Sequence, residues 1–323
     1  DGASKKQISP ITMSGATHHI PLSLSQEQIW LHEKLIQEIP IYNETLSFTI
    51  KEPVDQRIMQ KSLNEIVKRH EVLRSRVTVI NGVPHQNILP FEEASLPYYD
   101  FSPESEETKD AQINQIVTEQ AKRKFDLENE SPIRWMLFQR EHKHYKLFVV
   151  LHHISFDGVA MYQVFKPELE SLYQTFLAGK NSHLPELPFQ YSDYIQWQNL
   201  PENENLRQEQ LEYWKRKLAN LPALEMPTDF PRMPNTQHQG ARHCFLISKD
   251  TSIALKKFSK KEGTTPFTTL LSTFYMLLHF YTQQEDLAVG TVVAGRNYPG
   301  LNKLIGDFLN TIILRTKVTG DIS

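Results

Sequence analysis

Residues 147–151 read Leu-Phe-Val-Val-Leu, an unbroken apolar run that continues directly into His152 and His153. An apolar run of this length without alternation is typical of a β-strand that is buried on both faces. A helical pattern follows from about residue 159 to residue 178, with Pro167 inside it. Because proline lacks the N–H that a helix interior needs, we expect Pro167 to kink or split this helix. The chain must therefore bury a strand that leads through a short turn into a helix.

Helical and strand patterns alternate along the rest of the chain, which predicts an α/β fold. The first helix is expected to begin near Ser25, where Gln28 has the capping-box spacing, and Pro40 ends its segment. Asn81-Gly82 follows a period-two pattern and predicts a tight hairpin turn. The other expected helices are 55–70, one beginning at Ser102, 206–218 and 266–281, and the expected strands are 73–79, 133–139, 145–151, 287–293 and 309–316.

With 323 residues, the chain is too long for one small core, which suggests two lobes. Residues 1–20 are polar and without periodicity, so they are expected to be a linker. A stretch rich in Pro, Asn, Gln and Glu covers residues 181–206 and is the expected connection between lobes. The predicted division is therefore a linker at 1–20, a first lobe at 21–180, a connection at 181–206 and a second lobe at 207–323.

Several classes of function are disfavoured by composition. The net charge is −3 and the basic residues are spread along the chain, so we expect no nucleic-acid groove. The single cysteine, Cys244, allows neither an internal disulfide nor a Cys-based metal or redox motif, and we expect it to be a small core residue. No apolar run approaches the ~20 residues of a membrane span, and the N-terminus lacks the apolar core of a signal peptide. We therefore expect a cytoplasmic protein.

Residues 152–158, His-His-Ile-Ser-Phe-Asp-Gly, are the strongest candidate for chemistry. Adjacent residues on a strand point to opposite faces, so one histidine should face a cavity and the other the core. That geometry disfavours a metal site, which needs converging imidazoles. A purely structural pair remains open, while a general base fits the ability of histidine to transfer protons near neutral pH. Asp157 can brace the loop or take a charged partner, and Gly158 should let the chain turn into the helix.

This motif resembles that of acyltransferases of the chloramphenicol-acetyltransferase type. Four other segments resemble, in the same order along the chain, motifs of the condensation domains of nonribosomal peptide synthetases: 23–30, 69–75, 191–197 and 305–311. The first departs from the family pattern at Ser25 and Gln28, so a role for arginine there is lost. The seven-residue motif alone is moderately specific, but five motifs in register are strongly specific.

The resemblance implies two chloramphenicol-acetyltransferase-like lobes arranged as a V, with a tunnel between them. The last two motifs of the family do not occur before Ser323, so the second lobe is expected to be incomplete. In the family, a later segment completes the sheet of the first lobe. We therefore expect residues 1–323 to be inactive by themselves unless another polypeptide supplies that segment.

The resemblance also implies the reaction. A condensation domain forms an amide bond between a donor acyl or peptidyl thioester and an acceptor aminoacyl thioester. Both substrates arrive on the phosphopantetheine arms of carrier-protein domains, which are the expected partners together with neighbouring adenylation or polyketide modules. No cofactor or metal is expected to be bound by the domain itself. The alternatives are an epimerisation domain, which shares the motif, and a catalytically silent docking module of the same fold.

The implied roles of single residues follow the family. His153 is the expected catalytic residue, acting either as a base or as a group that orients the amine. His152, Asp157, Gly158 and Asn310 are expected to support the site. We expect Asp157 to be structural, paired with Arg296 as first choice or Arg74 as second.

Overall fold

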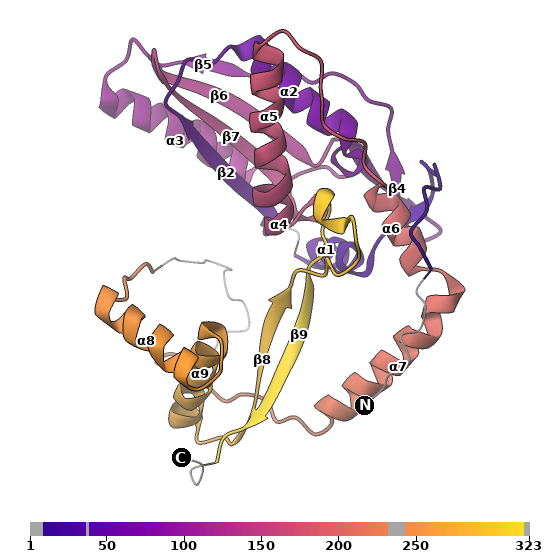
Figure 1. Ribbon diagram of the computed structural model, residues 1–323, viewed down its shortest axis with the longest axis vertical. Coiled ribbons are helices and arrows are strands. Elements are labelled where there is room, and N and C mark those ends of the chain that lie inside the picture. The colour runs from indigo at the N-terminus through magenta and orange to yellow at the C-terminus, as the bar shows by residue number, and fades with distance from the viewer. Residues whose placement is uncertain (1–8, 37–38, 232–242, 320–323) are drawn as a thin grey trace. The chain divides into compact units, whose positions relative to one another are not determined.

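The computed structural model describes residues 9–36, 39–231 and 243–319 (Figure 1). The chain divides into two compact units, and each is described by itself. The first unit contains Asp1–Glu204 together with Ala294–Asn310, and the second contains Asn205–Val293 together with Thr311–Ser323.

A four-stranded mixed sheet forms the centre of the first unit. Its strands are, in spatial order, β2 (Asn43–Ile50), β7 (His144–His152), β6 (Ile133–Glu141) and β5 (Tyr98–Asp100). The β2–β7 and β6–β7 pairs are antiparallel, while β5 runs parallel to β6. Because β7 has a neighbour on each side and apolar clusters on both faces, the prediction of a fully buried strand at 147–151 is confirmed.

Helices cover both faces of this sheet (Figure 1). Alternate residues of β7, Leu147, Val149 and Leu151, pack with α2 (Gln56–Arg69) and α5 (Lys166–Leu177) in one cluster. The opposite residues, Phe148 and Val150, pack with α3 (Glu106–Lys122) and α1 (Leu24–Leu35) in the other cluster. The period-two alternation of the strand thus divides the core into two layers, as an α/β fold requires.

A smaller sheet lies in the same unit, with strand order β1 (Ile20–Pro21), β4 (Val83–Ile88) and β3 (Ser75–Ile80). Asn81 and Gly82 both have positive φ, 51° and 83°, which is the geometry of the predicted hairpin turn. The expected strand from residue 73 begins at Ser75, because a 3₁₀ turn, η1 (Glu71–Arg74), precedes it.

Two predicted helix starts are displaced. α1 begins at Leu24, because Ser23 is the N-cap: its hydroxyl accepts from Gln26 N, and the Gln26 side chain accepts from Ser23 N. The capping box therefore lies two residues before the predicted Ser25–Gln28 pair. α3 begins at Glu106 with Ser105 as its cap, rather than at Ser102.

The helix expected after β7 is divided, as Pro167 predicted. A 3₁₀ turn, η2 (His153–Ser155), and a short turn, α4 (Gly158–Ala160), lead into a π-helical turn, η3 (Met161–Phe165). α5 follows from Lys166, and Pro167 occupies its first turn, directly after the π-helical turn.

Three predicted boundaries differ from the observed units. Ala294–Asn310, expected in the second lobe, belongs to the first unit, because Leu304, Ile305 and Phe308 are buried in its core. The segment 191–198, expected in the connection, forms α6 (Tyr191–Gln198) and also packs into that core. Residues 9–20 of the expected linker are ordered on this unit, and Ile11 is only 8% exposed; residues 1–8 lie outside the described residues.

The second unit contains α8 (Lys249–Lys261), α9 (Pro266–Thr282) and the two-stranded sheet of β8 (Asp286–Val293) and β9 (Asn310–Lys317). α7 (Pro201–Leu218) contains the division between the units. Tyr275, Leu278 and Leu287 form a small core.

The prediction that Cys244 is a core residue is wrong. Its side chain is exposed, because residues 243–248 form no strand and therefore have no sheet face to bury. None of the helices in the described ranges combines the length and the apolar character needed to cross a bilayer.

Candidate active site

His152 is the histidine that faces the core. Its side chain is fully buried at the end of β7, and its ring packs edge-on against Phe125 at 5.8 Å between centroids. Nδ1 accepts a hydrogen bond from Ile154 N at 3.3 Å, so the proton of the neutral ring is on Nε2. Nε2 lies 3.2 Å from the Glu33 carboxylate. Both ring nitrogens are therefore occupied in holding the turn that follows β7.

His153, by contrast, is only partly buried. Its backbone N donates to Tyr42 O at 2.9 Å, and its ring packs against Phe156 at 5.5 Å between centroids. Nδ1 is buried and has no hydrogen-bond partner among the described residues. Because Nδ1 is enclosed by the protein, Nε2 is the nitrogen that can meet a substrate.

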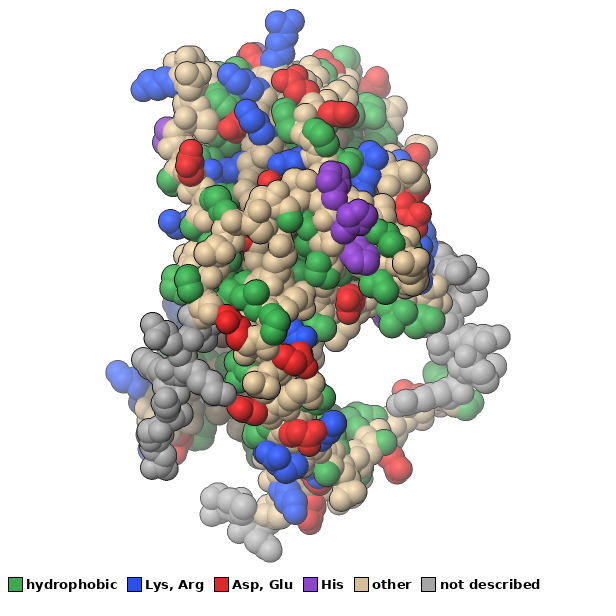
Figure 2. All heavy atoms as spheres, turned by 90° about the vertical axis from the view of Figure 1, so that its right-hand side faces the viewer, with side chains coloured by type: hydrophobic (Ala, Val, Ile, Leu, Met, Phe, Trp, Pro, Cys, Tyr) green, Lys and Arg blue, Asp and Glu red, His purple; other side chains and the backbone are tan. Residues whose placement is uncertain are grey.

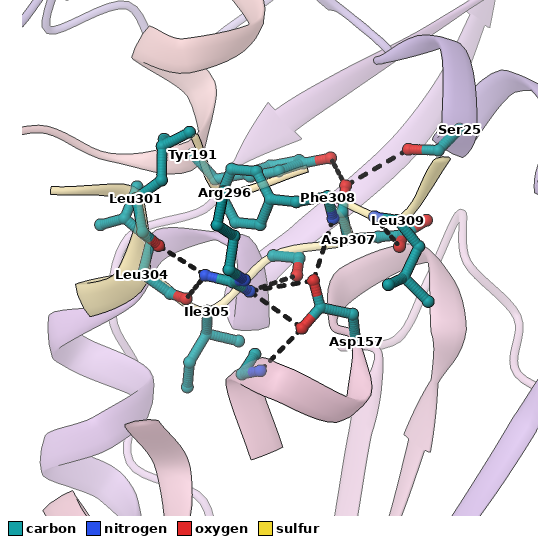
Figure 3. Close-up of polar contacts among 12 residues, drawn as sticks. Ser25, Asp157, Tyr191, Arg296, Leu301, Leu304, Ile305, Asp307, Phe308 and Leu309 are labelled. Atoms are coloured by element: carbon teal, nitrogen blue, oxygen red, sulfur yellow. Dashed lines mark hydrogen bonds and ion pairs between the residues drawn. The ribbon is translucent and has the colours of Figure 1, made fainter. Parts of the chain in front are cut away.

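Asp157 is fully buried and both of its oxygens are occupied (Figure 3). Arg296 Nη2 lies 2.9 Å from Oδ1 and 3.0 Å from Oδ2. Ala160 N donates to Oδ1 at 2.7 Å, which caps the start of α4, and Phe308 N donates to Oδ2 at 3.1 Å. The carboxylate is thus neutralised and points into a network of protein donors.

Arg296 ties the returning segment 294–310 to this turn. Its Nη1 donates to Leu301 O at 2.5 Å and Leu304 O at 2.9 Å, and its guanidinium lies 4.2 Å from the centroid of the Phe308 ring (Figure 3). Of the two expected partners of Asp157, the structure therefore pairs Arg296. Arg74 instead donates to Leu89 O and lies 3.4 Å from Glu71.

The chain turns into α4 at Gly158, but this position does not need the conformational freedom of glycine. It is exposed, its φ is not positive, and a Cβ added to it would meet no atom within 4 Å. A position near the site that does require glycine is Gly306, where an added Cβ would lie 2.3 Å from Cδ2 of Tyr191. Asn310, the remaining expected site residue, is exposed at the start of β9.

Asp307 is a buried acid that our sequence-based choice of site residues omitted. Its residue surface is 3% exposed, and its backbone O accepts from Tyr191 OH at 2.6 Å and Ser25 Oγ at 3.2 Å (Figure 3). Burial raises the pKa of its carboxyl to about 6, although the charge of His153 acts in the opposite direction. A signal was present in the sequence: an acidic residue within the otherwise apolar stretch 304–309.

Metal-binding groups do not converge in this structure. Histidine side chains gather on one face of the protein (Figure 2), and the rings of His19 and His85 lie 6.4 Å apart. Within the described ranges, however, no group of three or more His, Cys, Asp or Glu side chains could hold a metal ion.

Comparisons with known proteins agree with the five motifs. A family model described as "Condensation domain" matches residues 16–323. One of the linear gramicidin synthase subunits of Brevibacillus parabrevis is 36% identical over 321 residues, which cover 99% of this chain and 4% of that protein. Phosphinothricin tripeptide synthetase PhsC of Streptomyces viridochromogenes is 31% identical over 305 residues, 94% of this chain and 28% of that protein. The chain thus spans only a small part of these relatives.

Solved structures show the same fold at lower identity. The complex of the X-domain and OxyB from teicoplanin biosynthesis matches with a TM-score of 0.85 at 23% identity, over 98% of this chain and 69% of that chain. The first condensation domain of the CDA synthetase matches with a TM-score of 0.72 at 19% identity, over 96% of this chain and 73% of that chain. The predicted fold class is confirmed by these likenesses.

Proposed function

Because this chain belongs to the condensation-domain family of nonribosomal peptide synthetases, we propose that it joins two carrier-bound acyl groups through an amide bond. The donor is an acyl or peptidyl thioester and the acceptor an aminoacyl thioester, each on the phosphopantetheine arm of a carrier protein. One observation carries the proposal: the partly exposed ring of His153 lies on a turn that the Asp157–Arg296 ion pair holds in place.

The reaction needs a proton acceptor at the attacking nitrogen. The acceptor amine attacks the thioester carbon, forming the C–N bond, and the C–S bond then breaks. If His153 is the base, the proton lost by nitrogen passes to its Nε2 and from there to the departing sulfur, which leaves as a thiol. Protons and electrons balance in this sequence without a further reactant.

His153 can contribute in two ways that differ in size. An α-amine has a pKa of ~8, so about a tenth is already free base at pH 7. General-base catalysis typically contributes ~10²–10⁴-fold, whereas alignment of two tethered reactants can supply ~7–11 kcal/mol. Because forming the nucleophile costs little, His153 acts either on the proton lost during attack or by orienting the amine with a hydrogen bond.

His152 and Asp157 support this arrangement without touching the reacting atoms. The ring nitrogens of His152 are used by Ile154 N and Glu33, and the charge of Asp157 is neutralised by Arg296. Neither group is available to accept a substrate proton. Both fix the turn between β7 and α4, on which the orientation of His153 depends.

The test is amide formation from loaded carrier proteins by the natural full-length protein, with products identified by mass spectrometry. His153→Ala should lower the rate by at least ~10²-fold. His142→Ala is the matched control, because His142 is exposed in the hairpin between β6 and β7. An unchanged rate in the His153 variant would remove this residue from the mechanism, and an inactive wild-type protein would overturn the proposed reaction.

A docking role is the second candidate, and one observation favours it. The X-domain in the matched structure forms a complex with OxyB, and its fold agrees with this chain at a TM-score of 0.85. A docking module would bind a partner protein but give no amide from loaded carriers. An epimerisation domain, the other alternative, would invert the donor α-carbon without forming an amide, so product chirality distinguishes it.

The same proposal defines the surroundings of the reaction. Carrier-protein domains and neighbouring synthetase modules are the partners, the phosphopantetheine belongs to the substrates, and the reaction takes place in the cytoplasm. The domain supplies only side chains.

A further inference from the structure

Asp307 is held next to the turn that presents His153, and two neighbouring residues of α1 connect them. Ser25 Oγ donates to Asp307 O at 3.2 Å. The next residue, Gln26, donates through Nε2 to Ile154 O at 3.0 Å, and Ile154 directly follows His153. One turn of helix therefore contacts both the segment that carries Asp307 and the turn that carries His153.

Two further links lead to the same place. Phe308, which follows Asp307, donates its backbone N to Asp157 Oδ2 at 3.1 Å. Tyr42 O accepts from His153 N at 2.9 Å, and burial, then Glu33, then Asp307 raise the pKa of the Tyr42 hydroxyl. Tyr42 is thus close to both groups. The buried carboxylate and the candidate catalytic ring belong to one cluster within the first unit.

The three carboxylates around this turn are not equivalent. Asp157 is neutralised by Arg296, and Glu33 lies 3.2 Å from His152. Asp307 forms no ion pair with lysine or arginine in the described part of the chain. Its Oδ1 accepts from Leu309 N at 3.2 Å. Of these three carboxylates, Asp307 is therefore the buried one whose charge is left without a permanent counter-charge.

The electrostatics of this carboxyl group depend on several neighbours. Burial raises its pKa to about 6, His153 and the N–H of Leu309 oppose that rise, and Asp157 adds to it. At pH 7 the group is consequently ionised in most molecules. The titratable or charged groups that act on Asp307 or on its contacts are His153, Asp157, Arg296, Glu33, Tyr42, Tyr191 and Tyr194.

We propose that Asp307 is a positioning residue whose ionised carboxylate stabilises the protonated ring of His153, and this role rests on the proposed amide-forming function. When the attacking amine gives its proton to His153, the ring becomes a cation beside an uncompensated anion. Asp307 keeps its charge throughout, and the proton leaves His153 for the departing sulfur. In the resting site the Asp307 carboxylate has no lysine or arginine partner among the described residues, and protonation of the His153 ring brings a positive charge near it.

Asp307→Asn tests the role, because it removes the charge and keeps an oxygen that can accept from Leu309 N. An opposite charge nearby favours the charged form of a base, so its loss should make the His153 ring harder to protonate. In the natural full-length protein, the acid limb of kcat/KM against pH should move down by about one pH unit. Activity at pH 8 should fall about threefold, because the rate of general-base catalysis changes less than proportionally with the strength of the base.

A second readout does not depend on turnover. Diethyl pyrocarbonate modifies neutral imidazole, so the pH midpoint of His153 modification, measured by peptide mass spectrometry, should move down by the same amount in Asp307→Asn. The matched control is Asp193→Asn, because Asp193 is similarly buried at 5% exposure but accepts from Ser14 N and Gln190 N. This control should leave both midpoints unchanged.

The outcomes separate the two proposals. An inactive wild-type protein overturns the amide-forming function, while the modification midpoints still decide the role of Asp307. An active wild-type protein with identical midpoints in Asp307→Asn overturns the role of Asp307 alone. Equal shifts in the Asp193 control would also overturn it, because the effect would then be one of general structure.

Discussion

Arg296 Nη2 lies 2.9 Å from Oδ1 of Asp157 and 3.0 Å from Oδ2, although 139 positions separate the two residues in the sequence. Both side chains are buried, the arginine at 5% and the aspartate at 0% exposure. The contact fixes the returning segment 294–310 against the turn between β7 and α4. Its strength can therefore be measured through stability, independently of catalysis.

Asp157→Ala should destabilise the protein by ~3–5 kcal/mol, because removing one partner of a buried ion pair leaves the other charge uncompensated. We expect a melting temperature lower by on the order of 10 °C, measured by thermal denaturation. Glu104→Ala, at an exposed position, is the control. An unchanged melting temperature in the Asp157 variant would contradict the bracing role.

Arg296→Ala and Arg74→Ala should differ strongly, although both residues were candidate partners of Asp157. Arg74 pairs with Glu71 at 3.4 Å in a partly exposed position, and such pairs contribute only ~0–1 kcal/mol. Arg296→Ala should lower the free energy of unfolding several-fold more, as measured by denaturant titration, because the buried Asp157 carboxylate would lose its counter-charge. Equal losses of unfolding free energy in the two variants would show that the Asp157–Arg296 ion pair contributes no more to stability than the Arg74–Glu71 pair.

Asp307→Asn should make the protein more stable at pH 8 while it slows the proposed reaction. The folded-state pKa of about 6 is above the unfolded value of ~3.9, so between these values the folded state binds more protons than the unfolded state. The contribution of Asp307 to the free energy of unfolding is therefore fully present below pH ~4 and is lost as pH rises to about 6. Removing the charge should recover up to ~3 kcal/mol at pH 8 and little at pH 4. Urea titrations at both pH values check this, and a pH-independent difference would refute it.

Gly306→Ala should destabilise the protein by ~1–3 kcal/mol, a typical cost of overpacking. The added Cβ would lie 2.3 Å from Cδ2 of Tyr191, whose hydroxyl is bonded to Asp307 O. Gly158→Ala makes the same chemical change where the Cβ would meet no atom within 4 Å. Thermal denaturation should therefore separate the two variants, and equal melting temperatures would contradict the close approach seen at Gly306.

The features that local patterns determine were predictable. The apolar run at 147–151 identified the central strand, and Pro167 identified the division of the following helix. The cap of α1 was misplaced because Ser23 and Ser25 both have a glutamine or glutamate at a plausible distance, and only the folded backbone selects Ser23–Gln26.

Features that depend on distant contacts were not predictable. Which unit receives residues 294–310 depends on packing with segments more than a hundred positions away, and periodicity carries no such information. For the same reason we expected the turn to depend on glycine at position 158, although the φ of Gly158 is not positive. Glycine is needed at position 306 only because Tyr191 packs against it. Asp307 was missed because its importance depends on which buried carboxylates form ion pairs with lysine or arginine. A single sequence does not show those pairs.

The return of residues 294–310 to the first unit also affects how this unit folds during translation. Translation proceeds at about 5–20 residues per second, so roughly 7–28 s pass between synthesis of Asp157 and of Arg296. During that interval the aspartate has no guanidinium to neutralise it, and burying it alone would cost several kcal/mol. The turn that presents His153 therefore reaches its final form only after the intervening residues 205–293 have been synthesised.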